Sequence, residues 1–249
     1  MAGHSKYKNI MYRKGAQDKK RSAMFSKLSR EITVAAKMGL PDPDANARLR
    51  AAIIAARAQS MPKDNIQRSI DKASAGDAEN YEEIRYEGFG PGGVALIVEA
   101  LTDNRNRTAS EVRHVFAKND GNLGTSGAVA WLFERRGVLL VDADRAEEDD
   151  VVLAAADGGA DDVTQDGSSF QVTTTPENLT AVREALESAG IPVDSAETTM
   201  VAKTTVELGD EAAARKTLRL IDALEDLDDV SEVYANFDIA EHLLEAVAT

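Results

Sequence analysis

The order of strand and helix patterns in the last two thirds of the chain constrains its fold most strongly. Residues 138–196 are predicted to run strand, helix, strand, strand, helix, strand, with a hairpin turn at Asp166-Gly167. When this segment is set aside, residues 94–134 joined to residues 199–237 give the same order. The order is typical of the split βαβ pattern of ferredoxin-like sandwiches. We therefore predict one α+β domain inserted in another, with a single larger mixed sheet as the alternative.

The segment before this region has the periodicity of helices instead. Apolar residues recur at spacings of three and four within residues 18–38, which predicts an amphipathic helix. A second helix is predicted to begin at Asp42 as N-cap, with Pro43 at its first position. A third is predicted to begin near Asp64, which has the spacing of a capping box with Gln67.

Together these patterns predict a multidomain α+β fold, with an N-terminal three-helix unit and two ferredoxin-like α+β domains. Residues 1–80 would hold a basic arm and the helical domain, and they would end in a polar linker. Residues 81–136 and 198–249 would form a discontinuous α+β domain. Residues 137–197 would be the inserted domain.

Charge is distributed very unevenly along the chain. The formal net charge is −14, yet residues 1–72 contain 16 Lys or Arg against 6 Asp or Glu. A polyanion would therefore be attracted to one end of the chain and repelled by much of the remainder. The alternative for such a charged run is a merely solvated surface. Two tyrosines lie among the N-terminal cations and could stack on bases, which favours nucleic-acid binding and leaves DNA and RNA as open alternatives.

The candidate nucleic-acid-binding residues lie in the basic arm and on the predicted helices. They are His4, Lys6, Tyr7, Lys8, Tyr12, Arg13, Lys14, Lys19, Lys20, Arg21, Lys27, Arg30, Arg48, Arg50 and Arg57.

A possible second anion site lies where a predicted strand meets a predicted helix, at Asn104, Arg105 and Arg107. Free backbone N–H groups and two guanidinium groups could hold a phosphate there. In the alternative, Asp103 or Asn106 caps the helix and the arginines pair with neighbouring acids.

Signals for catalysis are sparse. The three histidines lack the spacing of a metal pair, and no acidic cluster follows a calcium-loop pattern, so we expect neither a metal nor another cofactor. The glycine-rich segment 88–93 precedes a strand and lacks Lys, so we interpret it as a turn and not as a phosphate loop. The chain has no Cys and no long apolar run, as expected for a soluble cytoplasmic protein that does not bind membranes.

Several ordered motifs resemble one known family. They are Ala2-Gly3-His4-Ser5-Lys6, Gln17-Asp18-Lys19-Lys20-Arg21, Phe25-Ser26-Lys27-Leu28-Ser29-Arg30-Glu31-Ile32, Met61-Pro62-Lys63-Asp64-Asn65-Ile66, Tyr86-Glu87-Gly88-Phe89-Gly90-Pro91-Gly92-Gly93, and Gly121-Asn122-Leu123-Gly124 followed by Trp131-Leu132-Phe133. On these motifs the whole chain resembles the YebC/PmpR family of probable transcriptional regulators.

The resemblance implies a cytoplasmic three-domain protein without catalytic activity or a small-molecule substrate. It implies DNA binding and regulation of transcription. Relatives that act in translation make a ribosome or ribosomal RNA the close alternative partner. A protein-interaction adaptor and, less favoured, an enzyme built on the α+β pair are the remaining alternatives.

Overall fold

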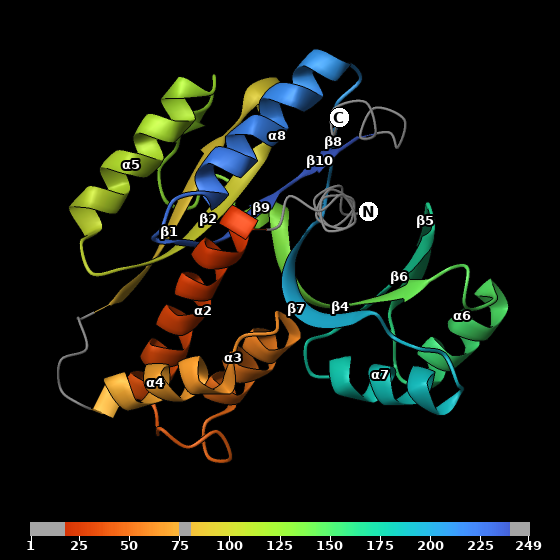
Figure 1. Cartoon of the computed structure of the whole chain (residues 1–249). Helices are drawn as coiled ribbons and strands as arrows, with labels where there is room; N and C mark the ends of the chain where they lie inside the picture. Colours follow the sequence, from red (N-terminus) through yellow and green to blue (C-terminus); the bar gives the residue numbers. More distant parts are fainter. Residues whose placement is uncertain (1–17, 75–80, 240–249) are drawn as a thin grey trace.

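The computed structural model describes residues 18–74 and 81–239 of the chain. Its helices and strands form three groups (Figure 1): a bundle of helices, an outer sheet and an inserted sheet. The α+β multidomain fold class is therefore confirmed. The proposed division of the chain at particular residues stays a prediction.

The helical unit consists of α2 (Asp18–Met38), α3 (Ala47–Ala58) and α4 (Lys63–Ser74). The apolar stripe predicted for the first helix is confirmed, since Ile32 and Ala35 lie in one buried cluster with Leu49 and Ile66. The predicted start of the second helix is wrong. The N-cap of α3 is Asn46, whose side chain accepts a hydrogen bond from the Leu49 N–H.

Two capping groups in this unit have other roles than the sequence suggests. Asp42 accepts a hydrogen bond from the Asp44 N–H and shapes a turn before α3. Gln67 donates to Asp71 one turn further along α4 and does not complete a capping box with Asp64.

The inserted sheet has the strand order β5-β6-β4-β7, and its neighbouring strands are antiparallel. Its elements are β4 (Phe133–Asp142), α6 (Glu148–Asp157), β5 (Asp162–Asp166), β6 (Ser169–Thr174), α7 (Leu179–Ser188) and β7 (Ser195–Ala202). This is the ferredoxin-like order that the sequence predicts, including the hairpin between β5 and β6. Strands β4 and β7 continue past the predicted limits of residues 137–197 at both ends.

The outer sheet has the order β3-β1-β2-β9, also with antiparallel neighbours. The outer unit, which contains this sheet, has the elements β1 (Glu82–Phe89), η1 (Pro91–Gly93), β2 (Ala95–Thr102), α5 (Arg105–Lys118), β3 (Asn122–Leu123), η2 (Ala130–Leu132), β8 (Val206–Glu207), α8 (Glu211–Glu225), β9 (Val230–Ala235) and β10 (Phe237–Asp238). Strands β8 and β10 form a separate parallel pair.

Two strand predictions for the outer sheet are wrong. Residues 130–132 form a 3-10 helix, and residues 199–202 complete β7 of the inserted sheet instead of an outer strand. The position next to β2 is occupied by β1, a strand that the sequence patterns did not reveal. The strands of the outer sheet are therefore connected along the chain in a different order from the strands of the inserted sheet.

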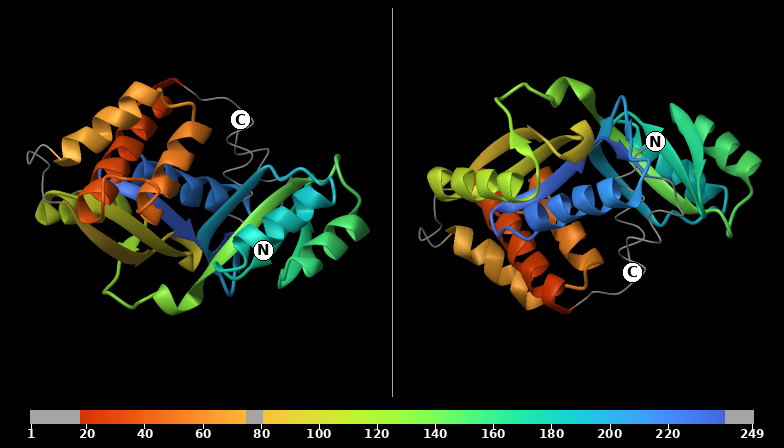
Figure 2. Two further views of the ribbon diagram at one scale, coloured as in Figure 1. Left: turned by 90° about the horizontal axis from the view of Figure 1, so that it is seen from below. Right: turned by 90° about the horizontal axis from the view of Figure 1, so that it is seen from above.

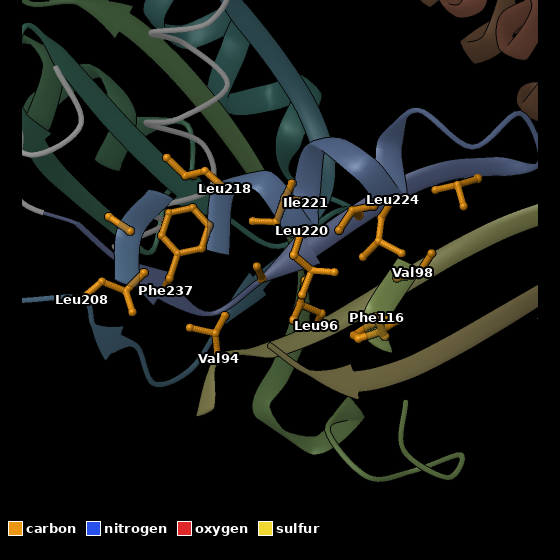
Figure 3. Packing of buried hydrophobic residues seen from close by; sticks show 14 of the residues in the cluster. Val94, Leu96, Val98, Phe116, Leu208, Leu218, Leu220, Ile221, Leu224 and Phe237 are labelled. Atoms are coloured by element: carbon orange, nitrogen blue, oxygen red, sulfur yellow. The ribbon is translucent and has the colours of Figure 1, made fainter. Parts of the chain in front are cut away.

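The two faces of the outer sheet pack against different partners. One face carries α5 and α8, and Figure 3 shows Leu96 and Val98 of β2 among the side chains of this core, with Leu220 of α8. Ile97 points to the other face and packs in a cluster with Phe133 at the start of β4. This second cluster joins the outer and inserted units, and both views of Figure 2 place the inserted unit at one end of the molecule.

Candidate nucleic-acid interface

Among the predicted site residues that the structure describes, those on helix α3 include two exposed arginines without an acidic partner. This helix contains three arginines and no acidic residue. Its buried side packs within the helical unit, while Arg50, Ile54 and Arg57 lie four and three residues apart and are all exposed. We call these three residues the α3 outer face.

The two arginines of the α3 outer face are held differently. The Arg50 guanidinium donates to the carbonyl oxygens of Pro43 and Asp44 at 3.0 and 3.3 Å. The Arg57 side chain makes no hydrogen bond or ion pair with any residue in 18–74 or 81–239. Neither cation is neutralised by a described acidic side chain, so both remain available to an anion.

Arg48, on the neighbouring side of α3, is paired with acids. Its guanidinium donates two hydrogen bonds to the carboxylate of Glu31, at 2.7 and 3.0 Å, and lies 2.5 Å from Glu83 of β1. The hydrogen bonds from Arg48 to Glu31 raise the arginine's pKa above its ordinary value. Arg48 therefore ties α2 and α3 to the start of the outer sheet.

Lys27 and Arg30 also contact an acidic segment of the chain, residues 225–229, instead of facing solvent. Lys27 is half-buried, and its ammonium donates to the carbonyl oxygen of Glu225 at the end of α8. Burial lowers the pKa of Lys27, although the acids around it partly oppose this effect. Arg30 donates to the carbonyl oxygen of Asp228 at 2.5 Å, and its guanidinium carbon lies 5.6 Å from the ring centre of Tyr81. The face of α2 that carries these cations is a domain contact.

Asp229 is the acceptor that links this contact to the predicted second site. Its buried carboxylate accepts hydrogen bonds from Thr102, Thr108 and Arg107 at 3.0, 2.7 and 2.7 Å. Arg30 approaches the other carboxylate oxygen at 3.7 Å. Burial alone would raise the pKa of Asp229, but the donated hydrogen bonds outweigh it and lower that pKa.

The second site divides between structural roles and one exposed cation. Asn104 is the N-cap of α5 and accepts from the Arg107 N–H at 3.1 Å. Arg107 donates to Asp103 and Asp229, and these bonds raise its pKa. The Arg105 side chain is exposed and forms no hydrogen bond or ion pair with another described residue. The pairing with acids that the alternative expects is therefore found for Arg107, but the helix cap is Asn104 and not Asp103 or Asn106.

The remaining candidates lie outside the described residues. They are His4, Lys6, Tyr7, Lys8, Tyr12, Arg13 and Lys14, together with the side chains of Lys19, Lys20 and Arg21 at the start of α2.

A loop that the sequence patterns left open proves to be held by a buried carboxylate. Glu87 of β1 is only 4% exposed and accepts from the N–H groups of Gly127, Val129 and Ala130 at 2.8, 2.8 and 2.9 Å. This loop leads to Trp131, the only tryptophan of the chain. The single tryptophan beside a glycine-rich segment was a usable signal in the sequence, whereas nothing there distinguished the buried Glu87 from the exposed Glu82 and Glu83 of the same strand.

Within residues 18–74 and 81–239, no group of three or more His, Asp or Glu side chains is arranged to hold a metal ion. No helix in these same ranges is long and apolar enough to cross a membrane.

Comparison with known proteins places the chain in one family over nearly its full length. Residues 5–76 match the TACO1/YebC protein N-terminal domain, and residues 81–237 match the TACO1/YebC second and third domain. A protein of Rubrobacter xylanophilus, named a probable transcriptional regulatory protein, is 55% identical, and the match covers 100% of both chains. A Zymomonas mobilis protein with the same description is 55% identical over 98% of each chain. The crystal structure of a conserved hypothetical protein from Aquifex aeolicus matches at 49% identity with a TM-score of 0.78, covering 90% of this chain and 93% of that one. The chain therefore belongs to the TACO1/YebC family.

Proposed function

We propose that the protein is a nucleic-acid-binding regulator of gene expression, acting in the cytoplasm as a DNA-binding transcriptional regulator. Binding would involve the basic N-terminal arm and the α3 outer face. The names of its relatives support a regulatory role. In this proposal the protein acts by binding alone, without a cofactor, a membrane or a small-molecule substrate.

The observation that carries the proposal is the unneutralised charge of the α3 outer face. Arg50 and Arg57 are exposed on a helix without acids, although the whole chain has a formal net charge of −14. Guanidinium groups bind phosphate with two donors in a fixed geometry. Small alanines on α3 would let a phosphate backbone approach closely. The acidic remainder of the chain would orient the bound polyanion away from itself.

A second candidate function, binding of ribosomal RNA, is favoured by the composition of the same face. Helix α3 contains no Asn or Gln, the side chains that pair with adenine in the major groove. Contacts from arginine to phosphate position a protein without reading sequence. Recognition of shape and backbone, which structured RNA also offers, fits this helix as well as duplex DNA does.

Charge reversal on the α3 outer face tests binding directly. The double variant Arg50→Glu and Arg57→Glu should bind labelled duplex DNA or ribosomal RNA at least tenfold more weakly. The slope of log K against log salt should fall by about 0.9 for each lost phosphate contact on a duplex. Arg183→Glu is the control, because Arg183 is also an exposed arginine on a helix but lies on α7 of the inserted unit. Unchanged affinity of the double variant for both polymers would refute the proposed interface.

Fractionation of cell extracts distinguishes the two targets. Ribosomal RNA would be the primary partner if the wild-type protein sediments with ribosomes at low salt, no longer does so at high salt, and the double variant does not sediment with them at all. Absence from all ribosomal fractions, together with retained binding to duplex DNA, would support the transcriptional function.

A further inference from the structure

Trp131 is exposed to a degree unusual for its size. The residue is 67% exposed, within the short 3-10 helix η2 that connects the outer and inserted units. Tryptophan is among the largest apolar side chains and is usually largely buried. An exposed tryptophan on a well-held segment therefore requires an explanation.

The backbone that carries Trp131 is fixed from both sides. Before it, the Glu87 carboxylate accepts the three loop N–H groups from Gly127, Val129 and Ala130. After it, the Leu132 carbonyl accepts from the Lys203 N–H at 2.8 Å. The indole N–H itself donates to the Ala128 carbonyl at 3.2 Å. The ring is thus presented on a pre-organised segment, which lowers the entropic cost of binding a partner.

Val129 and Phe133 anchor the same segment in the core. Both are buried, and they pack with Ala95 and Ile97 of β2 on the second face of the outer sheet. Trp131 lies between these anchors in sequence and yet remains outside the cluster. The fold therefore buries the neighbours of Trp131 and leaves the indole in solvent.

Exposed polar and cationic residues flank the short apolar segment 128–133 that carries Trp131. Before this segment, the loop residues Thr125, Ser126 and Gly127 are exposed, so the exposed chain there is not apolar. Arg135 follows on β4, and Lys203 is joined by its backbone to Leu132, the residue after Trp131. Both cations are exposed, and among the described side chains neither has an acidic partner.

We propose that Trp131 is a stacking platform for an unpaired base of a single-stranded nucleic acid, with Arg135 and Lys203 contacting the adjoining phosphates. Combining an aromatic face with flanking cations is how proteins bind single strands without reading sequence. A protein partner would instead favour a contiguous apolar patch around the tryptophan. The inference rests on the proposed function for the class of ligand, but it assigns a site separate from the α3 outer face.

Intrinsic fluorescence gives a specific test because Trp131 is the only tryptophan in the chain. Titrating the full-length protein with an unlabelled single-stranded oligouridylate should quench its tryptophan emission, since a stacked base contacts the indole directly. A fully paired duplex of equal length should quench much less, because its bases are already stacked. The stacking proposal would be overturned if a labelled oligouridylate binds saturably while the tryptophan emission stays unchanged.

Substitution of Trp131 provides the second readout. Trp131→Ala should weaken binding of the labelled oligouridylate about tenfold, and Trp131→Phe should largely retain it. Leu153→Ala is the matched control, because Leu153 is a large apolar residue, 66% exposed, on α6. Equal affinity of wild type and Trp131→Ala for the single strand would refute the site, as would a loss confined to a protein partner.

The α3 variant separates the failure of this proposal from failure of the general function. If Arg50→Glu with Arg57→Glu abolishes binding while Trp131→Ala has no effect, the proposed function holds and the stacking site is wrong. If the wild-type protein binds no single strand, duplex or structured RNA, both proposals fail together.

Discussion

The guanidinium of Arg107 and the carboxylate of Asp229 lie 2.7 Å apart, although 121 residues separate them in sequence. The same carboxylate lies 3.7 Å from Arg30 of the helical unit. One buried acid thereby connects α2, α5, β2 and the turn between α8 and β9. The helical unit is attached to the outer sheet at this point, and Figure 1 shows α2 beside the end of α8 and the start of β9.

Replacement of Asp229 should destabilise the protein. Asp229→Ala removes the charged acceptor of Thr102, Thr108 and Arg107, although the two hydroxyl groups keep their contacts with each other and with Asn104. A hydrogen bond to a charged group contributes about 1.5–3 kcal/mol, so the free energy of unfolding in urea should fall by at least about that amount. Asp228→Ala is the control, because Arg30 contacts only the carbonyl oxygen of Asp228. Equal midpoints for the two variants would contradict a stabilising role for the Asp229 carboxylate.

Arg30→Ala should loosen the attachment of the helical unit more than it weakens nucleic-acid binding. Arg30 donates to the Asp228 carbonyl and faces Asp229, so its loss removes a contact between two units. Hydrogen exchange at the amides of residues 226–230 should become faster. The loss of affinity for duplex DNA should be smaller than that of Arg57→Ala. The opposite order of the two affinities would place Arg30 on the binding surface instead.

The apolar periodicity of α2 predicted which face of this helix packs within the helical unit. It could not predict that the cationic face of α2 packs as well, because the partner of Lys27 is Glu225, nearly 200 residues away. The charge pattern alone made Lys27 and Arg30 look like binding residues. Arg50 and Arg57 were candidates by the same reasoning, and these two do lie on an exposed face.

Strand β1 escaped prediction for a local reason. Its sequence contains four acidic or basic residues before Gly88, and only Ile84 and Tyr86 alternate with them, which is too short an apolar pattern to predict a strand. Glu87 falls on the polar side of this alternation, yet it is buried. The inserted unit was easier to predict, because its apolar strand patterns and the Asp166-Gly167 turn signal lie next to one another in the sequence. The outer sheet combines segments from before and after the inserted unit, and periodicity cannot show that they pair.

Gly88→Ala should be strongly destabilising, although Gly88 lies in a regular strand. A Cβ atom at this position would lie 2.7 Å from the Asn122 carbonyl oxygen and 2.7 Å from a ring carbon of Phe116. Backbone and a packed ring cannot both move without cost, so the free energy of unfolding should fall by about 1–3 kcal/mol. Gly209→Ala is the control, because a Cβ there meets nothing within 4 Å. A thermal midpoint for Gly88→Ala equal to that of the control would show that β1 and β3 are less closely packed.

Glu87→Gln should make the protein less sensitive to acid and less stable at neutral pH. Burial alone would raise the pKa of Glu87, but the three backbone N–H donors outweigh it and hold that pKa below its ordinary value. A lowered folded-state pKa means that the stabilisation is present above about pH 4.3, the unfolded value, and is lost as pH falls through the folded value. Gln offers one acceptor oxygen, so at least one of the N–H groups of Gly127, Val129 and Ala130 loses its partner.

The measurement is urea unfolding of wild type, Glu87→Gln and the exposed control Glu184→Gln between pH 3 and pH 7. At pH 7 the Glu87 variant should be less stable than wild type by about 1–3 kcal/mol, and the gap should narrow below about pH 4 as the wild-type carboxylate becomes protonated. The control should follow wild type at every pH. A constant gap across the whole range would show that the negative charge of Glu87 does not hold the loop that carries Trp131.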